Sequence, residues 1–258
     1  MAELNGSTAS LKDLKALALT NFGHFTSMRV EEGGVRGLGL HMARIKRDSQ
    51  LLFDASPEEG SVREYIRRMV GKSGIYDVRV TIFDPNLELG TPGKKAEPHV
   101  LVTTRESGNL PLPPLSVRST SYAREMPAIK HAALFGTLWH RRAAQLNGFN
   151  DALFVDSQSV ISEGATWNVG FFDGDNVIWP SADVLEGVTM VLLKGVHKKT
   201  TSSQVCLSDL QHMEAAFATN AAIGVRAIKL IDDVAFPGEH PIIDTLREEY
   251  SQILPDVL

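Results

Sequence analysis

The stretch at residues 107–114 constrains the fold most, because it holds three prolines and shows no apolar period. A proline ring fixes φ and removes a backbone donor, so such a stretch continues neither a helix nor a sheet. With 258 residues, the chain is long enough to build a hydrophobic core on each side of it. We therefore predict a smaller N-terminal α/β domain at 1–106, a linker at 107–114 and a larger C-terminal domain at 115–258.

Apolar periodicity places the elements of the N-terminal part. Residues 11–19 fit either a helix or a strand, and residues 21–30 fit a turn followed by a strand. A hairpin turn at 31–34 and a return strand at 35–38 follow. The glycines of this stretch lack the spacing of a nucleotide-binding loop, so a hairpin explains them better. Helices are predicted from Leu40 onward and over 61–71. Residues 76–83 alternate cleanly and are predicted to pair with 99–104, with a surface loop between them.

The C-terminal part alternates between strands and helices. Strands are predicted at 115–122, 152–156 and 169–172, with a hairpin turn at 173–176 and its return strand at 177–179. Helices are predicted at 132–146, 190–196, 207–217 and 242–254, and a turn with a strand at 218–228. This alternation indicates a mixed α/β (α+β) fold.

Composition excludes several classes of protein. The formal charge of −5 argues against a dedicated nucleic-acid or anionic-membrane surface, although a local basic pocket stays open. The single Cys206 cannot form an intrachain disulfide. The first residues lack the apolar core of a signal peptide, and no run approaches the roughly 20 apolar residues of a membrane-spanning helix. We expect a soluble cytoplasmic protein without a metal site.

The chemistry is expected between Arg124 and Asn168. Lys130 precedes a predicted helix, and Glu163 lies on the turn beyond the strand that follows. A lysine and a carboxylate on rigid elements can hold pyridoxal phosphate, the first through a Schiff base and the second on the pyridinium nitrogen. Each could equally be an ordinary surface charge when considered alone.

The order and spacing of these residues resemble the class IV aminotransferase family, the pyridoxal-phosphate enzymes of fold-type IV. Arg124-x-x-Pro127-x-x-Lys130 with the downstream Glu163 carries the resemblance, which extends from about Phe22 to Ile228. The family includes D-amino-acid and branched-chain aminotransferases and aminodeoxychorismate lyase. The resemblance implies a two-domain, D-amino-acid-aminotransferase-like architecture and a homodimer.

The resemblance also implies roles around the cofactor ring. Lys130 would form the Schiff base, and burial beside a cation would keep its amine neutral enough to react. Glu163 would keep the pyridine nitrogen protonated. Asn168 would support Glu163, although turn chemistry explains it equally well. Leu185 would pack on the ring face, or it is a plain core leucine.

Three features are expected at the cofactor phosphate. Arg44, in His41-x-x-Arg44, matches the phosphate arginine of the family. The run Gly187, Val188 and Thr189 at a helix start offers backbone N–H groups and a hydroxyl. Asn220 and Ala221 resemble the second backbone contact, and this pair is closer to the lyase branch than to the aminotransferases, as are Ile129-Lys130-His131 and Phe25-Thr26-Ser27.

The substrate side departs from the family pattern. The arginine and histidine that trap a substrate carboxylate in D-amino-acid aminotransferases are missing from the loop after residues 99–104. His24, Thr26, Arg29 and Arg105 are the candidates for the substrate pocket. A lone histidine is more often a hydrogen-bonded core residue, so a structural role for His24 stays open.

The favoured function is transfer of an amino group between an amino acid and a 2-oxo acid, with Lys130 as the general acid and base. One alternative is a lyase of the aminodeoxychorismate type that releases pyruvate, in which Thr26 would donate a proton to the departing group. A third is a pyridoxal-phosphate-binding protein without turnover, because fold does not guarantee function. The substrates are expected to be small molecules.

Overall fold

The computed structural model describes residues 1–71 and 73–258. These residues form two compact units. The first unit contains Met1–Gly108, Ile129–Ala133 and Leu254–Leu258, and the second contains Asn109–Ala128 and Leu134–Ile253. The short stretches 129–133 and 254–258 thus pack with the N-terminal residues, although the sequence assigned them to the C-terminal domain. No helix of the described residues is both long and apolar enough to span a bilayer.

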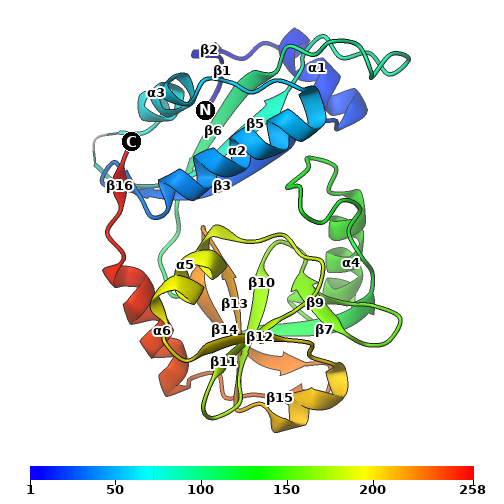
Figure 1. The fold of residues 1–258 in the computed structure, drawn as a ribbon, viewed down its shortest axis with the longest axis vertical. Coiled ribbons are helices and arrows are strands. Elements are labelled where there is room, and N and C mark those ends of the chain that lie inside the picture. The colour runs from blue at the N-terminus through cyan, green and yellow to red at the C-terminus, as the bar shows by residue number, and fades with distance from the viewer. Residues whose placement is uncertain (72) are drawn as a thin grey trace. The chain divides into compact units, whose positions relative to one another are not determined.

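The first unit is built on a seven-stranded antiparallel sheet in the order β16-β4-β3-β5-β6-β1-β2 (Figure 1). Its strands are β1 (Ala2–Leu4), β2 (Ser7–Thr8), β3 (His24–Glu31), β4 (Gly34–Val35), β5 (Ile75–Phe83), β6 (His99–Glu106) and β16 (Asp256–Val257). Its helices are α1 (Leu11–Thr20), α2 (Leu38–Phe53) and α3 (Glu59–Met69). The C-terminal stretch joins this unit because β16 pairs with β4.

The alternation of β3 separates two faces of this sheet. Met28 and Val30 point into the core that α2 and α3 cover, and Figure 1 shows α2 running along β3. β3 pairs with β5 over its whole length, from His24 opposite Ile82 to Glu31 opposite Ile75. The core between the sheet and α2 therefore fixes where residues of β3 and α2 meet.

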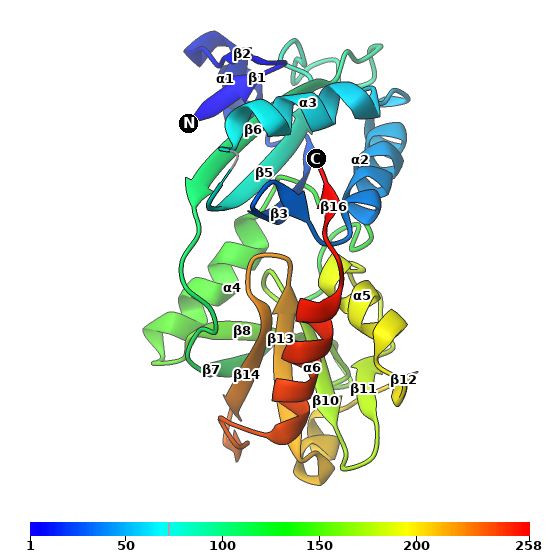
Figure 2. The same cartoon turned by 90° about the vertical axis from the view of Figure 1, so that its left-hand side faces the viewer.

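The second unit is built on a nine-stranded mixed sheet. Its strands are β7 (Leu115–Ser121), β8 (Asp151–Val155), β9 (Ile161–Gly164), β10 (Asn168–Phe172), β11 (Val177–Pro180), β12 (Thr200–Ser203), β13 (Ala215–Asn220), β14 (Gly224–Ile231) and β15 (Val234–Ala235). Its helices are α4 (Phe135–Leu146), α5 (Val188–Val196) and α6 (Pro241–Gln252), with a 3-10 helix η1 (Leu207–His212). Figure 2 shows α6 lying along β13 and β14.

The strands of this unit follow the order β12-β11-β10-β13-β14-β7-β8-β9, and β9 also pairs with β10. That extra pairing closes a path through six strands, β10, β13, β14, β7, β8 and β9. It rests on Glu163 opposite Asn168. A core of buried apolar side chains, among them Trp167 and Phe171, packs in this unit. The sheet's closure thus brings together two residues that the sequence singled out.

Most predicted elements are confirmed, including β5, β6, β7, β8, β10, β11 and α6 within a residue or two at each end. Residues 11–19, left open between helix and strand, form α1, which a capping box at Ser10 begins. The helix predicted over 61–71 begins earlier, because Glu58 caps it through the N–H groups of Gly60 and Ser61.

Four predictions were wrong. The return strand at 35–38 ends at Val35, since Gly37 takes φ +70° and α2 begins at Leu38. The helix predicted from residue 132 begins at Phe135. The helix predicted over 207–217 is η1 followed by β13, because the alanine-rich run from Ala215 is a buried strand between β10 and β14. Glu163 lies within β9 rather than on a turn.

Candidate functional site

Lys130 is held in an extended segment beside the start of β3. Its carbonyl accepts a hydrogen bond from the N–H of Phe25 at 2.8 Å, and the N–H of Ala132 donates to the carbonyl of Gly23 at 2.7 Å. His24 and His131 form the β-bridge between these two hydrogen bonds. The lysine is therefore fixed by strand-like pairing in the first unit rather than by the helix that follows it.

The side chain of Lys130 lies over an aromatic ring. Its Nζ is 5.0 Å from the centroid of the Phe25 ring, and the Phe25 side chain is buried. The backbone N–H of Lys130 donates to Oδ2 of Asp48 at 3.3 Å. Both ends of the Lys130 backbone are thus engaged, and the amine lies against an apolar face that a flat ring could share.

Thr26, His41 and Arg44 form a buried polar cluster between β3 and α2. The Thr26 Oγ1 lies 2.7 Å from Nδ1 of His41 and accepts from Nη1 of Arg44 at 3.4 Å. Burial, together with the charges of Arg44 and Lys130, lowers the pKa of His41 to about 3. The imidazole is therefore neutral at pH 7, and its Nε2 has no hydrogen-bond partner among the described residues.

His24 is completely buried in the first unit. Its Nε2 lies 2.8 Å from Oγ of Ser49, and its ring is 6.2 Å from that of Phe53. Burial lowers the pKa of His24 to about 4, although the charge of Asp48 opposes the shift. This position favours the structural alternative for His24 over contact with a substrate.

Arg29 and Arg105 lie in the first unit and already have acidic partners. The Nε of Arg29 is 2.7 Å from Glu31, and its Nη1 donates to Oγ of Ser107 at 2.5 Å. Arg105 is 77% exposed and lies 3.1 Å from a carboxylate oxygen of Asp77. The charge of each guanidinium is therefore balanced within the unit.

Arg79 is an arginine that sequence reasoning missed. Its Cζ lies 3.6 Å from the centroid of the Phe25 ring, and its Nε donates to Oγ1 of Thr81 at 3.2 Å. Among the described residues, no carboxylate lies within ion-pair distance of it, and burial lowers its pKa. The ring of Phe25 thus contacts an unbalanced guanidinium and the amine of Lys130. Periodicity alone predicts only a polar residue of an alternating strand at Arg79.

Glu163 is a buried carboxylate of the second unit with an arginine partner. Its Oε1 accepts from Nε of Arg124 at 2.8 Å, and the two side chains are 8% and 7% exposed. Its Oε2 accepts from the N–H of Leu185 at 3.3 Å. Arg124 also donates to the carbonyl of Pro127. The sequence showed Arg124 only as part of a motif, and its ion pair with Glu163 is a finding of the structure.

Asn168 links β10 to the residues that precede α5. Its Nδ2 donates to the carbonyl of Leu185 at 2.7 Å, and its Oδ1 accepts from the N–H of Gly187 at 3.1 Å. A Cβ at position 187 would lie 2.1 Å from that Oδ1, so only glycine allows this approach. Asn168 thus fixes the start of α5. Leu185 is buried, and its backbone N–H donates to Glu163.

The start of α5 offers hydrogen-bond donors to a bound group. Among the residues that the structure describes, no side chain caps the helix at Gly187, and the Val188 and Thr189 side chains that follow are buried. The Oγ1 of Thr189 has no hydrogen-bond partner among the described residues. A free helix N-terminus beside a buried hydroxyl favours an anion.

Asn220 ends β13, and Ala221 begins the turn that leads to β14. The Oδ1 of Asn220 accepts from the N–H groups of Ala222 and Ile223 at 2.9 and 3.0 Å, and its Nδ2 donates to the carbonyl of Thr166 at 3.1 Å. The Asn220 side chain therefore shapes the turn, and any contact to a bound group would come from the backbone of Ala221.

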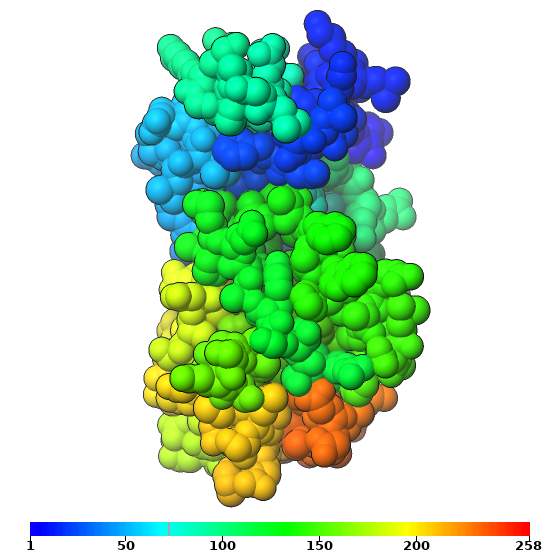
Figure 3. All heavy atoms as spheres, turned by 90° about the vertical axis from the view of Figure 1, so that its right-hand side faces the viewer, coloured from blue at the N-terminus to red at the C-terminus, as the bar shows by residue number. Residues whose placement is uncertain are grey.

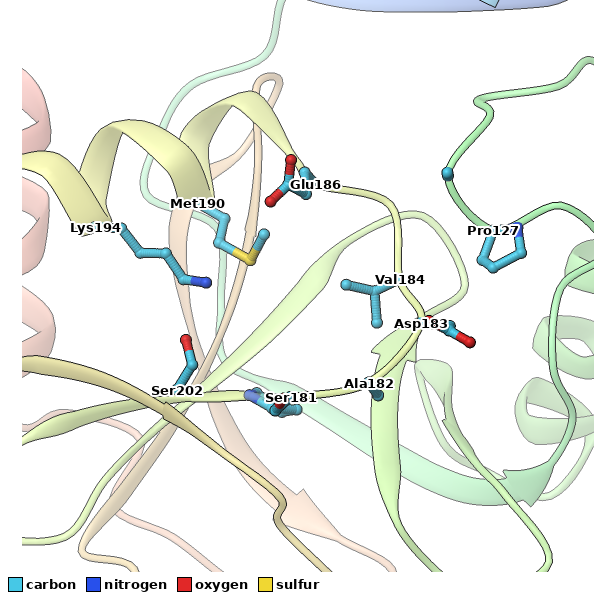
Figure 4. A pocket seen from close by; sticks show the side chains of 11 residues that line it. Pro127, Ser181, Ala182, Asp183, Val184, Glu186, Met190, Lys194 and Ser202 are labelled. Atoms are coloured by element: carbon cyan, nitrogen blue, oxygen red, sulfur yellow. The ribbon is translucent and has the colours of Figure 1, made fainter. Parts of the chain in front are cut away.

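The second unit also holds a pocket of about 260 Å³ beside the stretch that leads to Lys130. Figure 4 shows Lys194 of α5 and Ser202 of β12 pointing toward one another, with Met190 and Glu186 beside them. None of the site residues predicted from the sequence lines it. The described residues contain no group of three histidine, cysteine, aspartate or glutamate side chains suited to a metal ion.

The structure therefore places the predicted residues in two groups, one in each unit. Thr26, His24, Arg29, Arg44, Arg105 and Lys130 belong to the first unit, and Glu163, Asn168, Leu185, Gly187, Val188, Thr189, Asn220 and Ala221 belong to the second. In the first unit, the Lys130 amine and the guanidinium of Arg79 lie beside the ring of Phe25, and Arg44 adds a second guanidinium on α2. The second offers a fixed carboxylate and a place for an anion.

Comparison with known proteins gives a consistent result. The family model described as amino-transferase class IV matches residues 23–231. A probable branched-chain-amino-acid aminotransferase of Rickettsia bellii is 34% identical over 124 residues, which are 44% of this chain and 42% of that protein. The aligned stretch thus spans less than half the length of that relative.

Two solved structures share the fold over nearly the whole chain. The branched-chain amino acid aminotransferase of Escherichia coli has a TM-score of 0.84 at 16% identity, and the match covers 98% of this chain and 93% of that one. A hypothetical aminotransferase of Mycobacterium tuberculosis, solved in its PLP-bound form, has a TM-score of 0.79 at 15% identity, and the match covers 97% of each chain. The predicted fold class is therefore confirmed.

Proposed function

The chain belongs to the class IV aminotransferase family, and from this premise we propose that it is a pyridoxal-phosphate-dependent aminotransferase. It would move an amino group between an amino acid and a 2-oxo acid, with Lys130 as its central residue. The observation that carries the proposal is the extended segment that presents the Lys130 amine on the ring of Phe25.

The residues present fit the phosphate of the cofactor. The buried hydroxyl of Thr189 lacks a partner among the described residues, and the uncapped start of α5 offers N–H groups. Arg44, in the first unit, adds a guanidinium. Phosphate oxygens accept from hydroxyl and backbone N–H donors, which supports assigning Gly187 to Thr189 to phosphate binding. We propose Arg44 for the same role from its place in the family motif and from the bidentate donors of a guanidinium.

When bound, pyridoxal phosphate would supply an electron sink for charge that develops at the substrate Cα. Lys130 would first hold the cofactor covalently through Nζ. Once the substrate amine has replaced it, the freed Nζ would take the proton from Cα and return it as general acid and base.

Glu163 is proposed to pair with the pyridinium nitrogen. Its two oxygens are already oriented by Arg124 and by the N–H of Leu185, and carboxylate oxygens have further lone pairs for another donor. The guanidinium of Arg124 orients this carboxylate, and an ionised carboxylate is the form that would hold a pyridinium proton. Asn168 would hold Leu185 and the start of α5 in place.

Arg79 is proposed to bind a substrate carboxylate. Its guanidinium has no acidic partner among the described residues and lies on the same ring as the Lys130 amine. Burial of an unbalanced charge is costly, and a bidentate carboxylate would offset that cost. Arg29 and Arg105 are less suited, because each already pairs with a carboxylate.

No observation on the described residues favours the lyase alternative. The Thr26 hydroxyl is fully buried and hydrogen-bonded to His41, so it already takes part in the contact between β3 and α2 and is less suited to donate a proton to a departing group. The aminotransferase proposal therefore stands without a second candidate.

A second copy of the chain is proposed to cover part of α4. Phe135 and Trp139 stack on one another at 6.3 Å while remaining 80% and 56% exposed, and Leu138 beside them is half exposed. Figure 3 faces the side of the second unit on which α4 (green) lies at the surface.

Light scattering tests this proposal and should give the mass of a dimer for the parent protein. Trp139→Glu should lower the measured mass to that of a monomer. Leu89→Glu, in an exposed loop, should leave the mass unchanged.

Borohydride trapping tests the proposed function. The parent protein mixed with pyridoxal phosphate should turn yellow, and reduction should leave the cofactor's mass on the peptide that contains Lys130. Lys130→Ala should abolish both results, whereas Lys229→Ala, which changes an exposed strand residue, should abolish neither. A parent protein that binds no cofactor, or one trapped on another lysine, would overturn the proposal. Turnover with amino acids and 2-oxo acids then separates an enzyme from a binding protein.

A further inference from the structure

Asp48 is a buried carboxylate without a role in the proposed function. It lies on α2 and is fully excluded from solvent. Its Oδ1 is 2.7 Å from Nη2 of Arg47, whose own side chain is half exposed. A buried carboxylate requires hydrogen bonds or a counter-charge for both of its oxygens. Arg47 accounts for Oδ1, so Oδ2 requires a partner of its own.

That second oxygen, Oδ2, accepts the backbone N–H of Lys130 at 3.3 Å. Lys130 belongs to a five-residue stretch, Ile129–Ala133, that joins the first unit although the chain on both sides of it belongs to the second. Strand-like hydrogen bonds to Gly23 and Phe25 hold this stretch along one edge. Asp48, which belongs to α2, accepts a hydrogen bond from the N–H of Lys130 itself.

We propose that Asp48 is a positioning residue for Lys130, which ties the backbone of the reactive lysine to the helix that also carries Arg44. The inference rests on the proposed function, since it assigns Asp48 a role in presenting the lysine to the cofactor. It adds a residue that supports the lysine without contacting the cofactor or the substrate.

The spacing on α2 gives the proposal its physical basis. Arg44 and Asp48 are four residues apart, so they lie on one face of the helix, one turn from each other. A helix is rigid over one turn, and the two anchors therefore cannot move independently. The separation between the guanidinium offered to a phosphate and the backbone of Lys130 is then set by α2, as preorganised sites require.

The choice of a carboxylate also follows from the contacts. Asp48 faces a cation on one side and a backbone N–H on the other, and only a group with acceptors in two directions serves both. An asparagine at this position keeps an acceptor for the N–H of Lys130 but loses the ion pair with Arg47. A leucine of similar size removes both.

The test compares Asp48→Leu with Asp48→Asn and with a matched control, Asp84→Leu. Asp84 is also a buried carboxylate of the first unit, and it accepts the N–H groups of Asn86 and Glu97 instead. Two readouts are taken: the hydrogen-exchange rate of the Lys130 amide without cofactor, and the yield of pyridoxal phosphate trapped by borohydride on Lys130 at limiting cofactor. Asp48→Ser, too short to reach the N–H, carries the same comparison if Asp48→Leu does not fold.

Asp48→Leu should speed exchange of the Lys130 amide by about tenfold or more and reduce trapping by a similar factor, as loss of a charged acceptor implies. Asp48→Asn should stay within about threefold of the parent protein, since the neutral acceptor remains. Asp84→Leu should lower stability without changing either readout. Unchanged exchange and trapping in Asp48→Leu, or equal losses in Asp84→Leu, would overturn the inference. A parent protein that traps no cofactor would refute the proposed function instead, while the exchange result would still report on the contact between Asp48 and Lys130.

Discussion

Arg124 and Glu163 form a buried ion pair in the second unit, with Nε 2.8 Å from Oε1 and both side chains less than a tenth exposed. They are 39 residues apart in the sequence, and β8 and α4 lie between them. The pair orients the carboxylate proposed to face the pyridinium nitrogen. It also joins the segment that leads to Lys130 to the strand β9.

Replacing Arg124 with methionine should destabilise the protein. The change leaves Glu163 buried without its counter-charge, which costs roughly 3 kcal/mol of unfolding free energy. Denaturant unfolding of the full chain measures this loss of unfolding free energy. The matched change Arg63→Met, in an exposed pair with Glu59 on α3, should cost less than about 1 kcal/mol. Equal losses in the two variants would contradict the view that burial makes the Arg124 pair important.

Replacing Glu163 with glutamine should reduce turnover more than cofactor binding. A neutral amide cannot hold the pyridinium proton, and loss of such a preorganised charge typically reduces turnover by about 10²–10³-fold. The rate of the amino-transfer half-reaction and the absorbance of bound cofactor measure the two effects. Glu249→Gln, which removes a carboxylate paired with His197 in the same unit, serves as the control and should keep its rate.

Replacing Arg79 with leucine should weaken substrate binding. If its guanidinium binds a substrate carboxylate, the KM should rise about 10- to 100-fold, as expected for loss of a charged hydrogen bond. Retention of bound pyridoxal phosphate would show that the site itself is intact. Arg105→Leu, whose parent side chain is exposed and paired with Asp77, should leave the KM near that of the parent. The reverse outcome would transfer the carboxylate role to Arg105.

Acid should destabilise the first unit through His24 and His41. Burial holds their pKa values at about 4 and about 3, whereas an unfolded histidine has a pKa near 6.5. Below about pH 6.5 the unfolded state binds more protons, so unfolding free energy falls with falling pH until the folded pKa values are reached. Each histidine contributes up to about 1.4 kcal/mol per pH unit in that window.

The measurement is urea unfolding between pH 5 and pH 7.5. His24→Asn should show a shallower decline than the parent protein, because one source of proton uptake on unfolding is gone. His212→Gln, at an exposed position on η1, should leave the slope unchanged. Identical slopes in the parent and in His24→Asn would show that this histidine is not held neutral in the fold.

Local patterns were sufficient for many elements and for the family. The alternation at β5 and β6, and the glycine and asparagine after α4, act within a few residues and need no tertiary information. The run from Ala215 to Asn220 shows where this fails. Alanine favours a helix when considered locally, but pairing with β10 and β14 on both sides makes the run a buried central strand.

The sequence by itself determined the family, and through the spacing of Arg124, Pro127 and Lys130 it singled out the lysine. Tertiary structure alone decided the surroundings of that lysine. Strand pairing with β3 draws residues 129–133 into the first unit, where Asp48 and Phe25 meet Lys130. Such contacts join residues that are 82 or more positions apart, and they depend on sheet register and helix packing, which no local pattern encodes.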